Sequence, residues 1–150
     1  MENTLTCPLL VVEDNDTDFE IIQRLIKDAI LHEPIYRCTD GDDVLDFMYH
    51  EGAYQKSKQA PRPAVILLDL NLPGTDGRQV LEQLKQDIQL QQIPVVIFTT
   101  SNSPQDIEFC YHHGANGYLV KPLGLGKLRL TIQAFVDYWL LANISPSVYQ

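Results

Sequence analysis

Residues 64–77 read AVILLDLNLPGTDG, and this stretch decides the fold. It begins with five apolar residues, continues with Asp69, and then reaches a turn rich in proline and glycine. A continuous apolar run of this length is typical of a strand that is buried on both faces, and the proline and glycines end it. A carboxylate at the tip of a buried strand is costly unless it meets a cation, a hydrogen-bond donor or solvent. Asp69 is therefore the first candidate for chemistry.

The size and composition of the chain indicate one globular domain. It has 150 residues, of which 45% are hydrophobic and 21% charged, as in ordinary globular proteins. We expect a domain over residues 8–142, between an N-terminal segment (1–7) and a C-terminal tail (143–150). The longest apolar runs have about five residues, far short of the roughly 20 that a membrane span needs. The first residues lack the basic region of a secretory signal, so we expect a cytoplasmic protein that does not bind a membrane.

The charge balance argues against nucleic acid as a partner. The formal net charge is −9, and the 11 lysines and arginines are scattered along the chain. Binding to a phosphate backbone depends on clustered basic side chains, so we expect partners that are proteins. The three cysteines, Cys7, Cys38 and Cys110, lack the spacing of metal ligands and are expected to be buried, reduced thiols.

Short apolar runs alternate with helix-like periodic segments along the chain. Strands are expected at residues 8–12, 35–38, 64–69, 95–99 and 117–120. Helices are expected from about residue 17, with Asp16 as the cap, from 41, after 77, from 104 to 114 and from 126 to 141. Five strands that alternate with five helices indicate an α/β fold with a five-stranded parallel sheet. The fold class that we expect is the doubly wound, flavodoxin-like one.

Polar side chains stand at the ends of four of the expected strands. Glu13 and Asp14 follow the first strand, Asp69 ends the third, Thr99 ends the fourth and Lys121 follows the fifth. In a doubly wound parallel sheet such strand ends meet at one edge, where ligands bind. Each residue alone has an ordinary explanation: a helix-capping acid, a turn acid, a β-branched strand residue or a solvated lysine. Four such coincidences at four strand ends are far rarer than one, so we expect a site.

These residue types suit phosphoryl transfer assisted by a metal ion. Three carboxylates close together repel one another unless a cation is present, and oxygen ligands alone favour a hard ion such as Mg²⁺. Asp69 could attack phosphorus as a carboxylate nucleophile. Lys121 would offer a compact positive charge to the phosphate oxygens, and Thr99 would offer a hydroxyl donor. Positioning and charge stabilisation of this kind are what phosphoryl transfer requires.

Residues 8–141 resemble the receiver domain of two-component response regulators. The resemblance is carried by Val11-Val12-Glu13-Asp14, by residues 67–73 (LLDLNLP) with Asp76-Gly77, by residues 97–101 (IFTTS) and by residues 114–122 (GANGYLVKP). It implies a sheet order of 2-1-3-4-5 and, as is common among such domains, a cis bond between Lys121 and Pro122. It also implies a signalling phosphoacceptor rather than an enzyme, with intrinsic phosphotransfer and autodephosphorylation activity at most.

The same resemblance implies roles for the site residues. Asp69 would be the phosphoacceptor for a histidine kinase, and Thr99 and Lys121 would contact the phosphate. Magnesium would be held by Glu13, Asp14, Asp69 and the backbone carbonyl of Asn71. Tyr118 is similar to the aromatic switch residue that turns inward when the threonine moves. The signal would then spread through altered protein–protein contacts.

A finer resemblance is to the stand-alone receivers that partner bacterial, especially cyanobacterial, phytochromes. It rests on the loop at residues 51–63, on Thr99-Thr100-Ser101 and on residues 135–139 (FVDYW). It implies a light-sensing, phytochrome-type histidine kinase as the partner. The chain departs from many relatives at Leu123-Gly124, where phenylalanine is common. Asn71 occupies a position that varies in the family and is linked to the lifetime of the phosphate.

Three other interpretations compete with a phosphorylation switch. A phosphatase of the haloacid dehalogenase type needs a second acid two residues after its nucleophile, where this chain has Asn71. A flavodoxin-like binder of nucleotide or flavin needs a glycine-rich phosphate loop after the first strand, where this chain has acids. A degenerate receiver would act as a dimerisation or interaction module without phosphorylation, and the intact acids and Lys121 argue against it.

The last expected helix has more apolar residues than one face can use. One side should pack on the sheet and carries Leu125, Leu128, Ile132, Phe135, Val136 and Trp139. The opposite side carries Leu130, Ala134, Tyr138 and Leu141. A helix that is apolar on two sides is usually buried twice. We therefore hypothesise a homodimer through this second stripe, helped by Ile107, Tyr111 and Tyr118; scattered exposed apolar residues are the alternative.

Overall fold

The computed structural model describes residues 7–29, 34–56 and 59–146, and within them a five-stranded parallel sheet. The strands are β1 (Leu9–Val12), β2 (Ile35–Cys38), β3 (Val65–Leu68), β4 (Val95–Thr99) and β5 (Gly117–Val120). Their spatial order is β2-β1-β3-β4-β5, and every neighbouring pair is parallel. The predicted fold class and sheet order are therefore confirmed.

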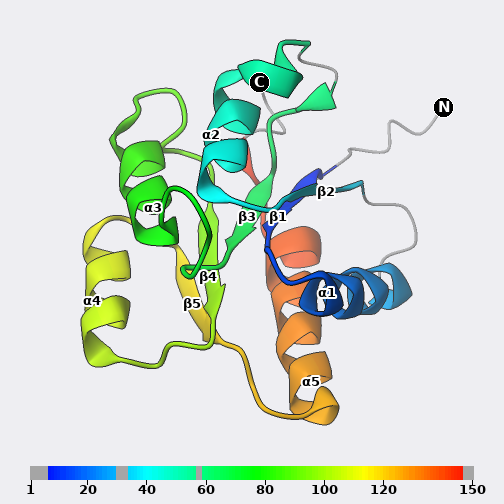
Figure 1. The fold of residues 1–150 in the computed structure, drawn as a ribbon. Coiled ribbons are helices and arrows are strands. Elements are labelled where there is room, and N and C mark those ends of the chain that lie inside the picture. The colour runs from blue at the N-terminus through cyan, green and yellow to red at the C-terminus, as the bar shows by residue number, and fades with distance from the viewer. Residues whose placement is uncertain (1–6, 30–33, 57–58, 147–150) are drawn as a thin grey trace, which may run out of the picture.

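Five α-helices cover the two faces of this sheet (Figure 1). They are α1 (Asp16–Ala29), α2 (Gly41–Tyr49), α3 (Gly77–Gln86), α4 (Pro104–His112) and α5 (Leu125–Phe135). Helices α1 and α5 lie on one face, and α2, α3 and α4 lie on the other. A short 3₁₀ turn, Gly52–Tyr54, interrupts the loop that was predicted after α2.

The strands bury both of their faces because alternate side chains enter two different cores. The core under α2, α3 and α4 takes Leu10, Val12, Ile66, Leu68, Val95 and Ile97. The core under α1 and α5 takes Leu9, Val11, Val65, Leu67, Val96 and Phe98. Since both sets are apolar, the strand sequences show continuous rather than alternating hydrophobicity. The carboxyl ends of the strands are thus held rigidly at one edge of the sheet.

Side-chain caps fix where most of the helices begin. Asp40 accepts a hydrogen bond from the backbone of Asp43, and Ser103 accepts one from Asp106. Asp76 forms a capping box at the start of α3. The predicted cap of α1, Asp16, is wrong by one residue, because the side chain of Asn15 accepts from the backbone N–H of Asp18 at 2.9 Å. Asp16 instead forms the first turn and pairs with Arg37.

The end of the chain differs from the predicted single helix over residues 126–141. Helix α5 stops at Phe135, and the chain continues as a π-helical segment, η3 (Val136–Ala142). Leu125 does not pack on the sheet as predicted. It is 56% exposed, because it lines a groove between α1 and α5 beside Ile21. The bond between Lys121 and Pro122 is trans, contrary to the implied cis form, since the described residues contain no cis peptide bond.

The two described ends of the chain meet at the amino end of β3. The backbone N–H of Ala64 donates to the carbonyl of Pro8 at 2.7 Å. The hydroxyl of Ser145 donates to the carbonyl of Ala64 at 2.9 Å. The predicted domain limits, 8 and 142, stay a prediction. No helix in the described part of the chain has the length and apolar character to cross a membrane.

Gly77 is required where the turn after β3 passes close to the start of α3. A Cβ atom at this position would lie 2.3 Å from the carbonyl oxygen of Asp69 and 2.6 Å from the Cα of Leu70. We expect Gly77→Ala to lower the free energy of unfolding by about 1–3 kcal/mol, because the backbone must shift. Urea unfolding measures the change.

Gly126→Ala is the matched control, because its added Cβ would meet nothing within 4 Å. This control should leave stability unchanged or raise it by up to about 1 kcal/mol, since alanine favours the helix. Equal stabilities of the Gly77→Ala and Gly126→Ala proteins would contradict the close approach.

Candidate functional site

The carboxyl ends of β1 and β3 bring three acids together. Glu13 and Asp14 directly follow β1, and Asp69 directly follows β3, its neighbour in the sheet. Each offers one carboxylate oxygen, and these oxygens all lie within 4.8 Å of one another. Glu13 and Asp69 are buried, whereas Asp14 is exposed. The cluster is thus closed on the protein side and open at Asp14.

Lys121 brings the balancing charge from the end of β5. Its ammonium Nζ donates to Oε1 of Glu13, to Oδ2 of Asp69 at 2.9 Å and to Oδ2 of Asp18 at 3.2 Å. Its backbone N–H donates to the carbonyl of Thr99 at 2.7 Å, so the strand itself fixes the start of the side chain. The structure therefore brings Lys121 to the predicted acids, and Asp18 is an additional partner.

Burial and charge oppose one another in this cluster. Burial raises the pKa of Glu13 to about 7, and the hydrogen bond from Lys121 works against that rise. Burial alone would lower the pKa of Lys121, but its hydrogen bonds with Glu13 and Asp69 raise the pKa overall. Lys121 is thus an ammonium ion whose positive charge the neighbouring carboxylates hold in place.

Backbone contacts orient the acids. Arg37 on β2 donates from Nε and Nη2 to the carbonyl of Glu13, both at 3.1 Å. The backbone N–H of Asn15 donates to Oε2 of Glu13 at 3.3 Å. The backbone N–H of Asn71 donates to Oδ1 of Asp69 at 3.2 Å. Both buried carboxylates are thus fixed through one oxygen by the backbone, while Lys121 holds the other.

A second hydrogen-bonded chain leads away from Thr99. This buried residue ends β4, and its hydroxyl oxygen accepts from the backbone N–H of Ser101 at 3.4 Å. The hydroxyl of Tyr118 donates to the carbonyl of Ser101 at 2.8 Å. The hydroxyl of Ser101 donates to Asp106, which also accepts two bonds of 2.8 Å from Arg78. A change at Thr99 can therefore reach α3, α4 and β5 through one loop.

The three carboxylates fit a divalent metal ion. A hard cation prefers oxygen ligands, and a set of anionic oxygens within 4.8 Å supplies them at one point. The fourth predicted ligand is the carbonyl of Asn71, which follows Asp69 by two residues. Asn71 is exposed and lies in the turn that follows β3. Because Asp14 is exposed as well, the cluster is open on the side from which an ion would arrive.

Sequence patterns alone did not single out several contacts of this site. Asp18 lies in the first turn of α1 whereas Asp14 precedes that helix, so no helical spacing relates the two acids and no pattern predicted the contact with Lys121. Arg37 is a charged residue within a short apolar strand, which is a weak signal of a specific partner. The link between Arg78 and Asp106 joins residues 28 positions apart, and no local pattern predicts it.

The residues predicted for a dimer surface differ in their exposure. Leu130, Ala134, Tyr138 and Leu141 are exposed along α5 and η3. Tyr111 on α4 is exposed, while Ile107 and Tyr118 are partly buried. The chain thus presents an exposed apolar stripe along α5 and η3.

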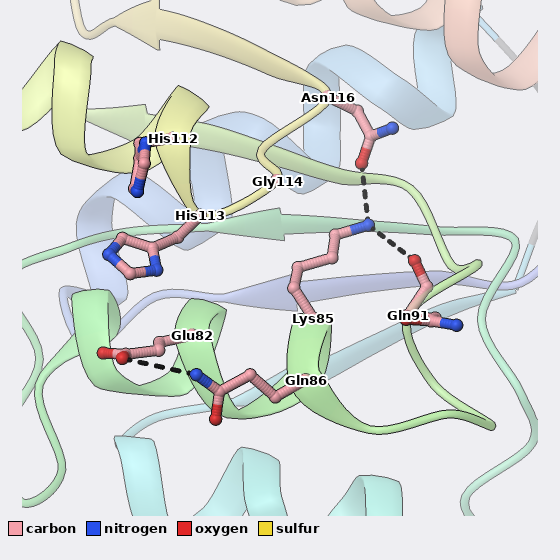
Figure 2. Close-up of a pocket in the computed structure, with 8 residues that line it drawn as sticks. All are labelled: Glu82, Lys85, Gln86, Gln91, His112, His113, Gly114 and Asn116. Carbon is pink, nitrogen blue, oxygen red and sulfur yellow. Dashed lines mark hydrogen bonds between the residues drawn. The ribbon is translucent and has the colours of Figure 1, made fainter.

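A separate hollow of about 500 Å³ lies at the opposite edge of the sheet (Figure 2). It is lined by Glu82, Lys85, Gln86, Gln91, His112, His113, Gly114 and Asn116. The ammonium of Lys85 donates to the carbonyls of Gln91 and Ile93 and to the side chain of Asn116, at 2.8–3.0 Å. Burial lowers the pKa of Lys85 to about 8. Lys85 thus donates its three hydrogen bonds to neutral oxygens. These bonds connect α3 to the loops before β4 and β5.

Comparison with known families decides what kind of domain this is. Residues 9–133 match the family described as the response regulator receiver domain. The chain belongs to this family. The phosphatase and flavodoxin-like alternatives are thereby set aside for this receiver domain.

Curated relatives of this receiver domain span almost the same length. It is 38% identical over 139 residues to the response regulator Rcp1 of Synechocystis. The alignment covers 93% of this chain and 92% of Rcp1. It is 39% identical over 139 residues to the probable methanogenesis regulatory protein FilR2 of Methanothrix harundinacea, over 92% of this chain and 86% of FilR2. The chain is thus about as similar to FilR2 as it is to Rcp1.

Solved structures give the same picture of the receiver domain. The phosphorylated cyanobacterial phytochrome response regulator RcpA superposes with a TM-score of 0.88 at 34% identity, over 94% of this chain and 99% of RcpA. The Mn²⁺-bound form of Rcp1 superposes with a TM-score of 0.87 at 36% identity, over 93% and 99%. A relative with this fold therefore binds a divalent metal, which agrees with the acidic cluster.

Lys121 is the charge on which the buried acids depend. We expect Lys121→Met to lower the free energy of unfolding by about 2–3 kcal/mol, because Glu13 and Asp69 would keep their burial and lose their cation. Excess Mg²⁺ should restore part of the loss. Urea unfolding with and without Mg²⁺ measures both effects.

Lys127→Met is the control, because Lys127 is exposed on α5. It should change stability by less than about 0.5 kcal/mol. A Lys121→Met protein as stable as the wild type, without metal, would show that the ammonium does not balance the acids.

Proposed function

We propose that this receiver domain accepts a phosphoryl group on Asp69 in a reaction that depends on Mg²⁺. The observation that carries the proposal is the ammonium of Lys121, 2.9 Å from Oδ2 of Asp69, beside an acidic cluster that fits a divalent ion. A nucleophilic carboxylate, a cation for the phosphate oxygens and a metal site are the parts that phosphoryl transfer to an aspartate needs. Signalling would follow through altered contacts with other proteins.

Each residue of the site has a separate task in this proposal. A carboxylate oxygen of Asp69 forms the new bond to phosphorus, and the bond from phosphorus to the donor breaks with its electrons on the leaving group. Lys121 offers its N–H groups to the transferred oxygens. Glu13, Asp14, Asp69 and the carbonyl of Asn71 would hold the metal ion. When bound, the ion would neutralise negative charge on the phosphoryl group.

The hydrogen-bonded chain beyond Thr99 supports a switch. If the hydroxyl of Thr99 turns toward a phosphoryl oxygen, it must leave the backbone N–H of Ser101. The carbonyl of Ser101 is the acceptor for Tyr118, so a shift of this loop would change where Tyr118 rests. We propose Thr99 and Tyr118 as the switch pair on these contacts. Asp69 is the phosphoacceptor of a signalling domain in this proposal, and the domain has at most intrinsic phosphotransfer and autodephosphorylation activity.

The proposed donor is a histidine kinase of the phytochrome type. Similarity to Rcp1 and to the phytochrome response regulator RcpA over nearly the full chain supports it. A cytoplasmic location follows from such a partner. The apolar and acidic surface, with a net charge of −9, fits protein rather than nucleic-acid partners.

The decisive experiment is intact-mass measurement after incubation with Mg²⁺ and acetyl phosphate. We expect the mass to rise by one phosphoryl group in the wild type. The adduct should be absent in Asp69→Asn, which keeps the shape of the side chain and removes the nucleophile, and absent when the metal is chelated. Asp87→Asn, at a partly buried acid that caps the carboxyl end of α3, is the control and should still form the adduct.

A wild-type protein that forms no adduct would favour the phosphorylation-independent interaction module. A second arm offers autophosphorylated kinases as donors and compares a phytochrome-type kinase with an unrelated one. Faster transfer from the phytochrome-type kinase supports the proposed partner. Equal transfer from both would overturn the partnership and leave the phosphoacceptor role intact.

We further propose a homodimer through the apolar stripe of the last helix. Leu130, Tyr138 and Leu141 are large and exposed, and single exposed apolar residues are normal whereas a row along one helix is less so. Tyr111 on α4 is a further large, exposed apolar residue. A second copy of this chain would bury the stripe against its own.

The double variant Leu130→Ser/Tyr138→Ser should shift the protein toward monomer in sedimentation experiments. The matched control is Ile88→Ser, an exposed apolar residue that is not on the stripe, and it should leave the dimer unchanged. Sedimentation with and without phosphoryl donor tells whether phosphorylation changes the equilibrium. A wild-type protein that is monomeric both with and without phosphoryl donor would rule out the proposed homodimer.

A further inference from the structure

We infer that Asp18 is a positioning residue that holds Lys121 back from an incoming phosphoryl group and so slows phosphorylation of Asp69. The inference rests on the proposed function and deepens it. It starts from a contact that motif comparison did not supply: Oδ2 of Asp18 lies 3.2 Å from Nζ of Lys121. Asp18 comes from the first turn of α1, not from the end of a strand.

The ammonium of Lys121 has no hydrogen left for a phosphate. A lysine ammonium carries three N–H donors. Lys121 directs hydrogen bonds to three carboxylates, those of Glu13, Asp69 and Asp18. A phosphoryl oxygen can therefore be bound by Lys121 only if one of the three carboxylates gives up its bond.

Burial and distance select Asp18 as the carboxylate that yields. Its side chain is 41% exposed, against 2% for Glu13 and 8% for Asp69. Water can replace the lost contact at the half-exposed carboxylate of Asp18, whereas separating Lys121 from a buried carboxylate leaves that charge without a partner. The contact of Lys121 with Asp18 is also longer than its contact with Asp69, 3.2 Å against 2.9 Å.

The place of Asp18 in the fold keeps its carboxylate at the mouth of the site. Its backbone N–H donates to the side chain of Asn15 at 2.9 Å, which fixes the first turn of α1. The amino end of a helix favours a negatively charged side chain. Asp18 thus presents a fixed negative charge to an anionic donor and at the same time occupies the lysine that the donor needs.

Asp18→Asn tests the inference, because it keeps the size of the side chain and removes its charge. With Mg²⁺ and acetyl phosphate, we expect phosphorylation of this variant to be roughly three- to tenfold faster than that of the wild type, the effect of one unit charge a few ångströms away in a watery site. Asp18→Glu, which can still reach Lys121, should return the rate toward the wild-type value. Raising the salt concentration should narrow the difference, since exposed charges are screened.

Asp28→Asn is the matched control. It makes the same chemical change at an exposed position of α1, about 15 Å further along the helix axis, and should leave the rate unchanged. A rate for Asp18→Asn equal to that of Asp28→Asn, or slower than the wild type, overturns the inference while the wild type still forms its adduct. A wild type without any adduct overturns the proposed function and this inference together.

Discussion

The ammonium of Lys121 binds carboxylates from the ends of β1 and β3 and from α1. The rest of the structure depends on these contacts. Buried carboxylates such as those of Glu13 and Asp69 are tolerated only with a counter-charge. The parallel sheet supplies it, because β1, β3 and β5 all end at the same edge. Neighbouring parts of the fold keep that edge fixed. Arg37 holds the carbonyl of Glu13 from β2, and α3 starts so close to Asp69 that only glycine fits at position 77.

In the proposed function, the same arrangement divides the small domain into two functional parts. The acids and Lys121 form the part that would meet a phosphate and a metal ion. Thr99, Ser101 and Tyr118 form the part that joins this edge to α4 and β5. Arg78 and Asp106 then tie that loop to α3 through paired hydrogen bonds of 2.8 Å. A rearrangement at Thr99 would therefore act on contacts between helices, which is where a partner protein can detect it.

Sequence patterns predicted the strands well because β1, β3 and β4 are continuous apolar runs that end at or just before a polar residue. Val95 to Thr99 and Gly117 to Val120 have the predicted bounds. The candidate residues could be proposed for a similar reason, since the ends of parallel strands share an edge and the residue types there suggested the chemistry. The roles of Asp69, Thr99 and Tyr118 stay predictions. The contact between Asp18 and Lys121 was out of reach, because it joins residues 103 positions apart on a helix and a strand. The cap of α1 and the π-helical segment after α5 were not predicted either, because competing local hydrogen bonds decide both.

The meeting of the chain's two described ends at Ala64 has a practical consequence. Pro8 and Ser145 both bond to the backbone of this residue at the amino end of β3, while the acidic cluster lies at the carboxyl end of the same strand. In a chain trimmed to residues 8–145, handles fused to Pro8 and Ser145 would start close together at the edge of the sheet opposite to Asp69. Immobilising or labelling such a trimmed protein through these ends would leave the edge with the acidic cluster facing solvent, and a short peptide from Ser145 to Pro8 could close it into a circle without crossing that edge.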